Sequence, residues 1–134
     1  MAAIIEDYCD FETAKFLKEK GFHEICKCQY GRHGDISLTS CNNGNVTTFA
    51  RPTLQMVMKW LRKVYHIEIS ITFGFPFIDG KVQYKYFWSV VKVCNNHLEY
   101  PMNNPNDTTC HEEISDSYEE AVEAAIKYCL ENLI

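Results

Sequence analysis

Residues 67–74 read Ile67-Glu-Ile-Ser-Ile-Thr-Phe-Gly74, in which apolar side chains alternate with polar or small ones. Successive side chains of an extended strand point to opposite faces, so this alternation predicts a strand with one apolar face. Asp79-Gly80 follows, a dipeptide typical of the tight turn between two antiparallel strands. We therefore expect residues 82–93 to return alongside residues 67–74 and complete a hairpin.

The turn also fixes the register of this hairpin. With Asp79 and Gly80 as the loop, Ile78 lies opposite Lys81. Counting back sets three pairs on the apolar face: Phe73 with Tyr86, Ile71 with Trp88 and Ile69 with Val90. A slip of one residue would set these side chains against the polar face, so we expect this register.

Three segments have the spacing of amphipathic helices. The clearest spans residues 117–134, where Ser117 and Glu120 form a capping box and an apolar stripe follows at once. That stripe consists of Ala121, Val122, Ala125, Ile126, Cys129, Leu130 and Leu133. A shorter helix is expected over residues 11–20, capped by Asp10 and stopped by Gly21.

The remaining helix begins at Pro52-Thr53 and ends near Tyr65. Its apolar face consists of Leu54, Val57, Met58, Leu61 and Val64. Short strands are expected near residues 24–30, 36–39 and 98–100, and long polar loops over residues 31–50 and 101–116. This order predicts an α+β fold in a single domain over residues 1–134. An antiparallel β-meander of about three to four strands packs against the helices in a sandwich-like arrangement.

The composition limits the classes of protein to which this chain can belong. The chain has 134 residues, of which 46% are hydrophobic, enough for one ordinary core. No apolar run approaches the roughly 20 residues that a membrane-spanning helix needs, and Glu6 interrupts the first apolar run before a signal-peptide core could form. We therefore expect a cytoplasmic protein without a membrane partner. Its seven cysteines are an odd number, which favours reduced thiols over a disulfide framework.

Charge is unevenly distributed along the chain. Residues 1–93 hold 12 basic and 9 acidic side chains, a net +3, whereas residues 94–134 hold Lys127 against 9 acids, a net −8. The order helix, three strands, helix is also that of the double-stranded-RNA-binding module, whose second helix starts with basic residues that meet phosphates. Here that start is Ser117-Tyr-Glu-Glu120, so its charge argues against nucleic acid. A basic helix edge keeps a nucleic-acid binder as an alternative; it consists of Lys59, Arg62 and Lys63.

Three segments carry a resemblance to known proteins. They are Asp10-Phe-Glu-Thr-Ala-Lys-Phe-Leu-Lys-Glu-Lys-Gly-Phe22, Thr53-Leu-Gln-Met-Val-Met-Lys-Trp-Leu-Arg62 and Tyr118-Glu-Glu-Ala-Val-Glu-Ala-Ala-Ile-Lys-Tyr-Cys-Leu-Glu-Asn-Leu-Ile134. Through them, most of the chain resembles a group of small uncharacterised proteins from gut-bacterial genomes and prophage-like elements. The order of elements is also similar to that of the phage ABA-sandwich domain. The resemblance implies a cytoplasmic bacterial or phage accessory protein, and it transfers no activity and no functional residues.

A metal site is one alternative, because thiolate and imidazole are the ligands of tetrahedral zinc. Five such residues lie close in sequence: His23, Cys26, Cys28, His33 and Cys41. Cys26 and Cys28 would point to the same side of an extended segment and could share a metal. Their Cys-x-Cys spacing lacks the two-residue gap of the usual zinc knuckle, and ordinary reduced thiols explain the cysteines as well.

A cysteine-dependent enzyme is also an alternative, because histidines are available as bases: His33, His66, His97 and His111. The chain has no recognisable catalytic signature, however. It contains no Gly-x-Ser-x-Gly elbow, no phosphate loop and no dinucleotide fingerprint. We therefore assign no catalytic residue and no cofactor.

Aromatic residues suggest an interaction surface. Eight tyrosines, eight phenylalanines and two tryptophans offer more aromatic area than one sheet face needs. Phe75, Phe77, Tyr84 and Phe87 gather around the hairpin end and could bind a partner protein or a second copy of the chain; the alternative is that they close one core. Together with the missing catalytic motifs, they predict a non-catalytic accessory or protein-interaction protein of a bacterial mobile element or phage.

Overall fold

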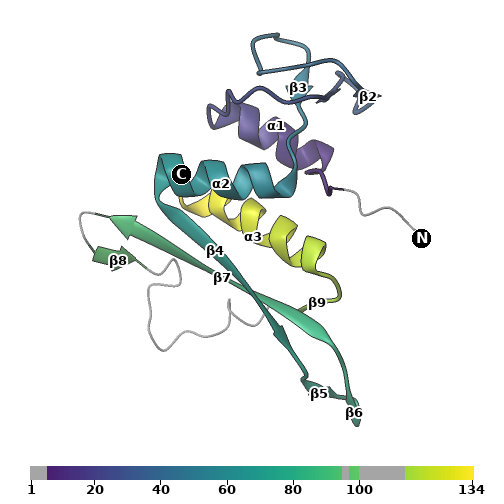
Figure 1. Cartoon of the computed structure of the whole chain (residues 1–134), viewed down its shortest axis with the longest axis vertical. Helices are drawn as coiled ribbons and strands as arrows, with labels where there is room; N and C mark the ends of the chain where they lie inside the picture. Colours follow the sequence, from purple (N-terminus) through teal and green to yellow (C-terminus); the bar gives the residue numbers. More distant parts are fainter. Residues whose placement is uncertain (1–5, 95–96, 100–113) are drawn as a thin grey trace. The chain divides into compact units, whose positions relative to one another are not determined.

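The computed structural model describes residues 6–94, 97–99 and 114–134. It has the α+β architecture that the sequence predicts, and its described residues form three helices and small antiparallel sheets (Figure 1). The chain divides into two compact units, Met1–Val57 and Met58–Ile134, which are described in turn. The expectation of a single domain over residues 1–134 stays a prediction.

The first unit begins with helix α1 (Phe11–Glu19), which is capped at both ends as the sequence predicts. The Asp10 carboxylate accepts a hydrogen bond from the Thr13 amide at 2.8 Å. At the other end Gly21 adopts a φ of 89°, and the amides of Gly21 and Phe22 donate back to carbonyls of the last helical turn. Phe22 is fully buried, so the chain turns directly from the helix into the core of this unit.

The first unit also contains a three-stranded antiparallel sheet. Its strands are β1 (Gln29–Tyr30), β2 (Ile36–Ser37) and β3 (Phe49–Ala50), in the order β2-β1-β3. The strand expected near residues 36–39 is confirmed as β2. The long loop expected over residues 31–50 is wrong at its end, where β3 lies. A strand of two residues is too short to show an alternating pattern, which is why the sequence gives no signal for it.

Side chains order the polar segment between β2 and β3. Asn43 is buried, with 7% of its surface exposed, and its backbone adopts a left-handed φ of 65°. Its side-chain amide donates to the Phe22 carbonyl at 2.8 Å and accepts from the Ala50 amide at 2.7 Å. The Lys18 ammonium donates to the Thr48 carbonyl at 2.7 Å. This segment is therefore held by hydrogen bonds from side chains to backbone groups.

Helix α2 (Leu54–Tyr65) begins and ends where the sequence predicts, and the division between the two units falls within it. The Thr53 hydroxyl accepts from the Met56 amide at 3.1 Å and caps the first turn. The expected apolar face is buried at Leu54, Val57, Met58 and Leu61. Its last member, Val64, is 51% exposed, because the buried face ends at Leu61 before the last turn of the helix.

The second unit is built on the predicted hairpin, formed by β4 (Ile67–Gly74) and β7 (Lys85–Cys94). All four predicted pairs are present: Ile69 with Val90, Ile71 with Trp88, Phe73 with Tyr86 and Ile78 with Lys81. The last of these belongs to a short extension that carries the turn, made of β5 (Phe77–Ile78) and β6 (Lys81–Val82). Asp79 and Gly80 have φ values of 52° and 76°, as the predicted tight turn requires.

Strand β7 is the central strand of this sheet. β4 lies on one side of it, and β8 (His97–Glu99) and β9 (Ile114–Ser115) lie on the other. The strand expected near residues 98–100 corresponds to β8. β9 contradicts the expected loop over residues 101–116, since it pairs with β7 through two residues that carry no strand pattern of their own. Residues 100–113 of that loop lie outside the described residues.

Helix α3 (Tyr118–Asn132) covers one face of the hairpin (Figure 1). The Ser117 hydroxyl caps the helix by accepting from the Glu120 amide at 3.1 Å, as predicted. The predicted stripe is fully buried at Ala121, Val122, Ala125, Ile126, Cys129 and Leu130. None of the helices in the described part of the chain is long and apolar enough to cross a membrane.

Candidate functional site

The apolar face of the hairpin is longer than the helix that covers it. Ile67 and Ile69 are 0% and 5% exposed, whereas Phe73, on the same face of β4, is 47% exposed. Phe75, two residues further along, is 59% exposed. α3 begins at Tyr118 and covers only part of the hairpin, which extends well beyond the helix toward β5 and β6 (Figure 1). The end of the apolar face is therefore left open to solvent.

Four aromatic rings occupy this open end, and we call Phe73, Phe75, Tyr84 and Tyr86 the aromatic quartet. The Phe73 ring stacks on Tyr84, with ring centroids 5.5 Å apart and ring planes 11° from parallel. The centroid of the Phe73 ring lies 4.9 Å from that of Phe75 and 5.3 Å from that of Tyr86. The ring centroids of Phe75 and Tyr84 are 5.2 Å apart. Aromatic pairs at such separations attract each other by about 0.5–1.5 kcal/mol beyond simple burial. The four rings thus form one continuous, mutually supported surface.

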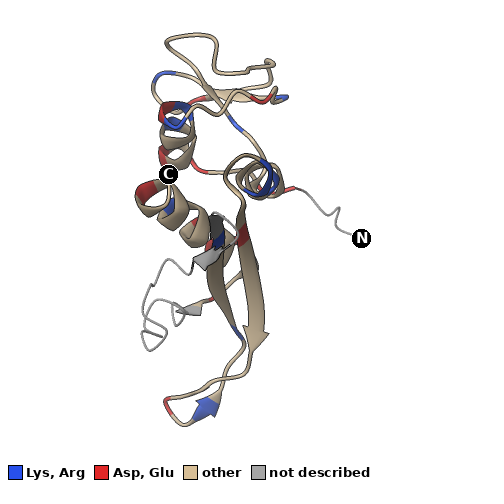
Figure 2. Cartoon of the chain, turned by 90° about the vertical axis from the view of Figure 1, so that its left-hand side faces the viewer, with Lys and Arg blue, Asp and Glu red and all other residues tan. Residues whose placement is uncertain are grey.

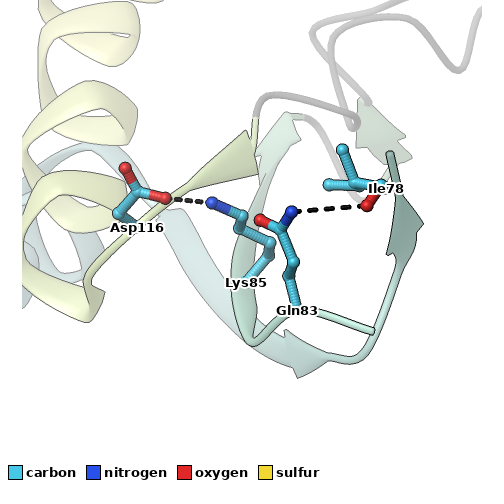
Figure 3. A network of polar contacts seen from close by, with 4 residues as sticks. All are labelled: Ile78, Gln83, Lys85 and Asp116. Carbon is cyan, nitrogen blue, oxygen red and sulfur yellow. Dashed lines mark hydrogen bonds and ion pairs between the residues drawn. The ribbon is translucent and has the colours of Figure 1, made fainter. Parts of the chain in front are cut away.

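Polar contacts order the backbone that carries these rings (Figure 3). The Gln83 backbone amide donates to the Pro76 carbonyl at 3.0 Å. The Gln83 side chain donates to the Ile78 carbonyl at 3.4 Å, as Figure 3 shows. The Lys85 ammonium pairs with the Asp116 carboxylate and so ties β7 to the segment that leads into α3. These contacts link the two strands of the hairpin end to each other and link β7 to the start of α3.

The charge beside the quartet is negative. Tyr118 contacts Tyr86 of the quartet edge to face, with ring centroids 6.3 Å apart, which places the start of α3 next to the rings. Glu119 and Glu120 at this helix start are exposed, whereas the charge of Asp116 is balanced by Lys85. The hairpin itself carries few charged residues (Figure 2). A partner that covers the rings would therefore meet acidic groups along one edge of its contact.

The four aromatic residues predicted to bind a partner do not lie on one surface. Phe75 and Tyr84 belong to the quartet, and Phe77 is 73% exposed in β5. Phe87 lies on the opposite face of the sheet, where its ring packs against the backbone of Gly74. A side chain at Gly74 would clash, because an added Cβ would stand 2.8 Å from that ring.

Sequence reasoning missed the remaining members of the quartet. Phe73 and Tyr86 continue the apolar face, and that pattern alone assigns them to the core. The signal that could have identified them is the register itself, since the pairing of Phe73 with Tyr86 places Phe75 next to Tyr84 at the hairpin end.

The Cys/His-rich segment of the first unit buries its cysteines and leaves its histidines exposed. Cys26 and Cys41 form an antiparallel backbone pair, with amide-to-carbonyl distances of 2.8 and 2.9 Å. Cys28 is buried with them, as the predicted same-side placement of Cys26 and Cys28 requires. His23 and His33 are exposed. Across the described residues, no group of three or more His, Cys, Asp or Glu is arranged to hold a metal ion.

Each of the three thiols has its own backbone partner. Cys26 Sγ donates to the Glu24 carbonyl at 3.6 Å, Cys28 Sγ donates to the Arg51 carbonyl at 3.5 Å, and Cys41 Sγ accepts from the Asn43 amide at 3.4 Å. These contacts satisfy the weak hydrogen-bonding capacity of buried thiols. Among the described residues, five buried cysteines form no disulfide, namely Cys9, Cys26, Cys28, Cys41 and Cys129, and the reduced state of the chain stays a prediction.

Burial also sets the reactivity of two thiols. It raises the pKa of Cys26 to about 12, with smaller contributions from Cys28, Cys41 and Glu24, and it raises the pKa of Cys129 to about 12. The thiolate is the reactive form, so at pH 8 only about one such thiol in ten thousand would be ionised. We expect iodoacetamide at pH 8 to leave both residues unmodified in the native protein and to modify both in urea, as read by peptide mass spectrometry. Rapid native modification of Cys26 would contradict this assignment.

Arg51 links the N-terminal segment to the small sheet, a role that the sequence did not suggest. Its guanidinium lies 4.1 Å from the centroid of the Tyr8 ring and 5.5 Å from that of Tyr30, within range of cation–π attraction. Arg51 Nη1 also donates to Cys28 Sγ at 3.6 Å. A cavity of 370 Å³ lies beside it, lined in part by Tyr8, Cys26, Arg51, Gln55 and Met56. These contacts account for Arg51 as a structural residue of the first unit.

The cysteine-dependent enzyme and the nucleic-acid binder stay predictions. Among the histidines expected as bases, His33 and His66 are exposed, His97 begins β8, and His111 lies outside the described residues. The basic helix edge is exposed as well, and Arg62 Nη1 lies 4.0 Å from a carboxylate oxygen of Glu68. Comparison of the chain with protein-family models, with curated proteins and with solved structures finds no match.

Proposed function

We propose that this protein is a non-catalytic interaction protein, and that its partner binds the aromatic quartet. The observation that carries the proposal is the continuity of the apolar face: it is buried at Ile69 and exposed at Phe73 and Phe75. Large apolar side chains are rarely exposed side by side in monomeric proteins unless they mark an interaction site. Aromatic anchors also dominate the binding energy of protein interfaces.

The partner is proposed to be a protein segment with apolar anchors flanked by lysine or arginine. Its anchors would extend the stacked rings, and its basic groups would face Glu119 and Glu120. Opposite charges at the rim of an interface accelerate binding and select among partners. We also propose an accessory role in a bacterial mobile element or phage. This role is what the resemblance of the sequence to small gut-bacterial and prophage proteins implies.

A peptide selection tests this function directly. A displayed library of random 16-residue peptides is selected on the full-length protein, and the best peptide is labelled for fluorescence polarisation. We expect the double variant Phe75→Ser and Tyr84→Ser to raise the Kd of that peptide about 30-fold or more, because central aromatic anchors carry most of the binding energy.

The matched control removes two equally apolar, exposed side chains from the first unit. Leu38 and Val46 are each 89% exposed, and the double variant Leu38→Ser and Val46→Ser should leave the Kd unchanged. Enriched peptides should also be rich in lysine and arginine, and Glu119→Lys with Glu120→Lys should weaken their binding. Peptides that bind equally well to the quartet variant would contradict the proposal.

A further inference from the structure

The outer edge of β4 is a second surface of the second unit. β4 pairs with β7 along all eight of its residues, and no other described strand pairs with it. In an edge strand, alternate residues point their amides and carbonyls away from the sheet, ready to pair with another strand. β4 therefore offers a long, regular template for pairing.

β4 also lacks the features that usually protect such an edge. It contains no proline, lysine or arginine, its pairing with β7 runs without a bulge, and Glu68 is its only charged residue (Figure 2). Its other residues are mostly β-branched or aromatic, which favours strand pairing. Natural edge strands are commonly short, bulged or rich in charge, because an open edge invites association.

We propose that two copies of this chain pair through the outer edge of β4, antiparallel about a two-fold axis at Ser70. The opposed residues, one from each copy, are then Ser70 and Ser70, Ile69 and Ile71, Glu68 and Thr72, and Ile67 and Phe73. Apolar residues meet apolar residues on one face, and polar residues meet polar residues on the other. The strand is thus complementary to itself, which is the condition for a two-fold interface between identical chains.

Other registers match less well, and an axis at Ile69 would pair only residues 67–71 of the strand. A shift of one residue would place the apolar face of one copy beside the polar face of the other. An axis at Ile71 would set Glu68 opposite Gly74, which has no side chain to contribute a cross-strand contact. The axis at Ser70 gives every opposed residue a side-chain neighbour and keeps the two copies of Glu68 apart. This inference goes beyond the proposed function, since it concerns backbone pairing along the edge of β4, which shares only Phe73 with the aromatic quartet.

A charge placed on the axis tests the register. In the proposed dimer residue 70 faces itself, so Ser70→Lys and Ser70→Glu should each place like charges opposite each other and abolish the dimer. Mixing the two variants places lysine opposite glutamate and should restore it. Sedimentation equilibrium of the full chain reads the outcome, with the wild type expected at twice its chain mass of 15.6 kDa.

Thr72→Lys is the matched control, since it adds the same side chain to the same face of the same strand. It would face Glu68 of the second copy, so this variant should remain dimeric. Circular dichroism of each variant checks that the chain is folded. A wild type that stays monomeric at every concentration would overturn the inference, and so would a dimer that survives Ser70→Lys. Pairing of β4 only with a foreign strand peptide would overturn it too, because the edge would then serve another partner.

Discussion

Replacing Trp88 by alanine is expected to lower the free energy of unfolding of the second unit by about 3–5 kcal/mol, the usual cost of truncating a buried aromatic side chain. Trp88 is 2% exposed, lies opposite Ile71 in the hairpin and contacts the ring of Tyr128 on α3, with centroids 5.4 Å apart. Its removal leaves a cavity between sheet and helix that cannot close without moving both. Urea unfolding followed by far-UV circular dichroism measures the loss.

Tyr84→Ala is the matched control, because Tyr84 is an aromatic residue of the same hairpin that is 68% exposed. Its two ring contacts lie on the surface, so its truncation should cost about 1–3 kcal/mol, less than Trp88→Ala. The contrast separates the core part of the apolar face from the part that is free for binding. An equal loss from both variants would mean that the quartet stabilises the fold and is not a binding surface.

Replacing Asn43 by alanine is expected to destabilise the first unit by about 2–6 kcal/mol, since it leaves two buried backbone groups without partners at about 1–3 kcal/mol each. The Phe22 carbonyl would lose its donor and the Ala50 amide its acceptor. Alanine would also be strained at the left-handed φ of 65°. The effect should appear in thermal unfolding as a lower midpoint.

Two further substitutions of Asn43 separate these causes. Asn43→Gly tolerates the left-handed backbone, so it should be more stable than Asn43→Ala by about 1 kcal/mol while still losing both hydrogen bonds. Asn43→Asp keeps the acceptor for Ala50 but buries a carboxylate against the Phe22 carbonyl oxygen, so at neutral pH it should destabilise the first unit at least as much as Asn43→Ala. Stability unchanged in all three variants would show that the segment between β2 and β3 does not contribute to the first unit.

The elements that could be predicted from sequence are those whose signals are local. The Asp79-Gly80 turn set the register of β4 and β7 through residues that are close along the chain. Asp10, Gly21 and Ser117 marked helix ends because capping depends on one side chain and the adjacent backbone. β3 and β9 could not be predicted, since each is two residues long and exists only through a distant partner strand.

The candidate site was only partly predictable for a related reason. Phe75 and Tyr84 were identified from aromatic content at the hairpin end, but the exposure of Phe73 depends on where α3 starts relative to the sheet. That position is set by tertiary packing and leaves no trace in the alternation of β4. Likewise, Cys26 and Cys28 were correctly placed on one side of an extended segment, whereas their neighbour Cys41 comes from a distant turn of the chain.

The order of α3 after the hairpin has a consequence for synthesis on the ribosome. The hairpin is closed by a two-residue loop, so it can form as soon as β7 has emerged from the ribosome. The residues that cover it, from Tyr118 onward, emerge later, after a delay of about seconds at ~5–20 residues per second. During that interval the face that includes Ile69 and Trp88 has no helix over it, and the nascent chain offers chaperones a transient apolar strip that the finished protein no longer has.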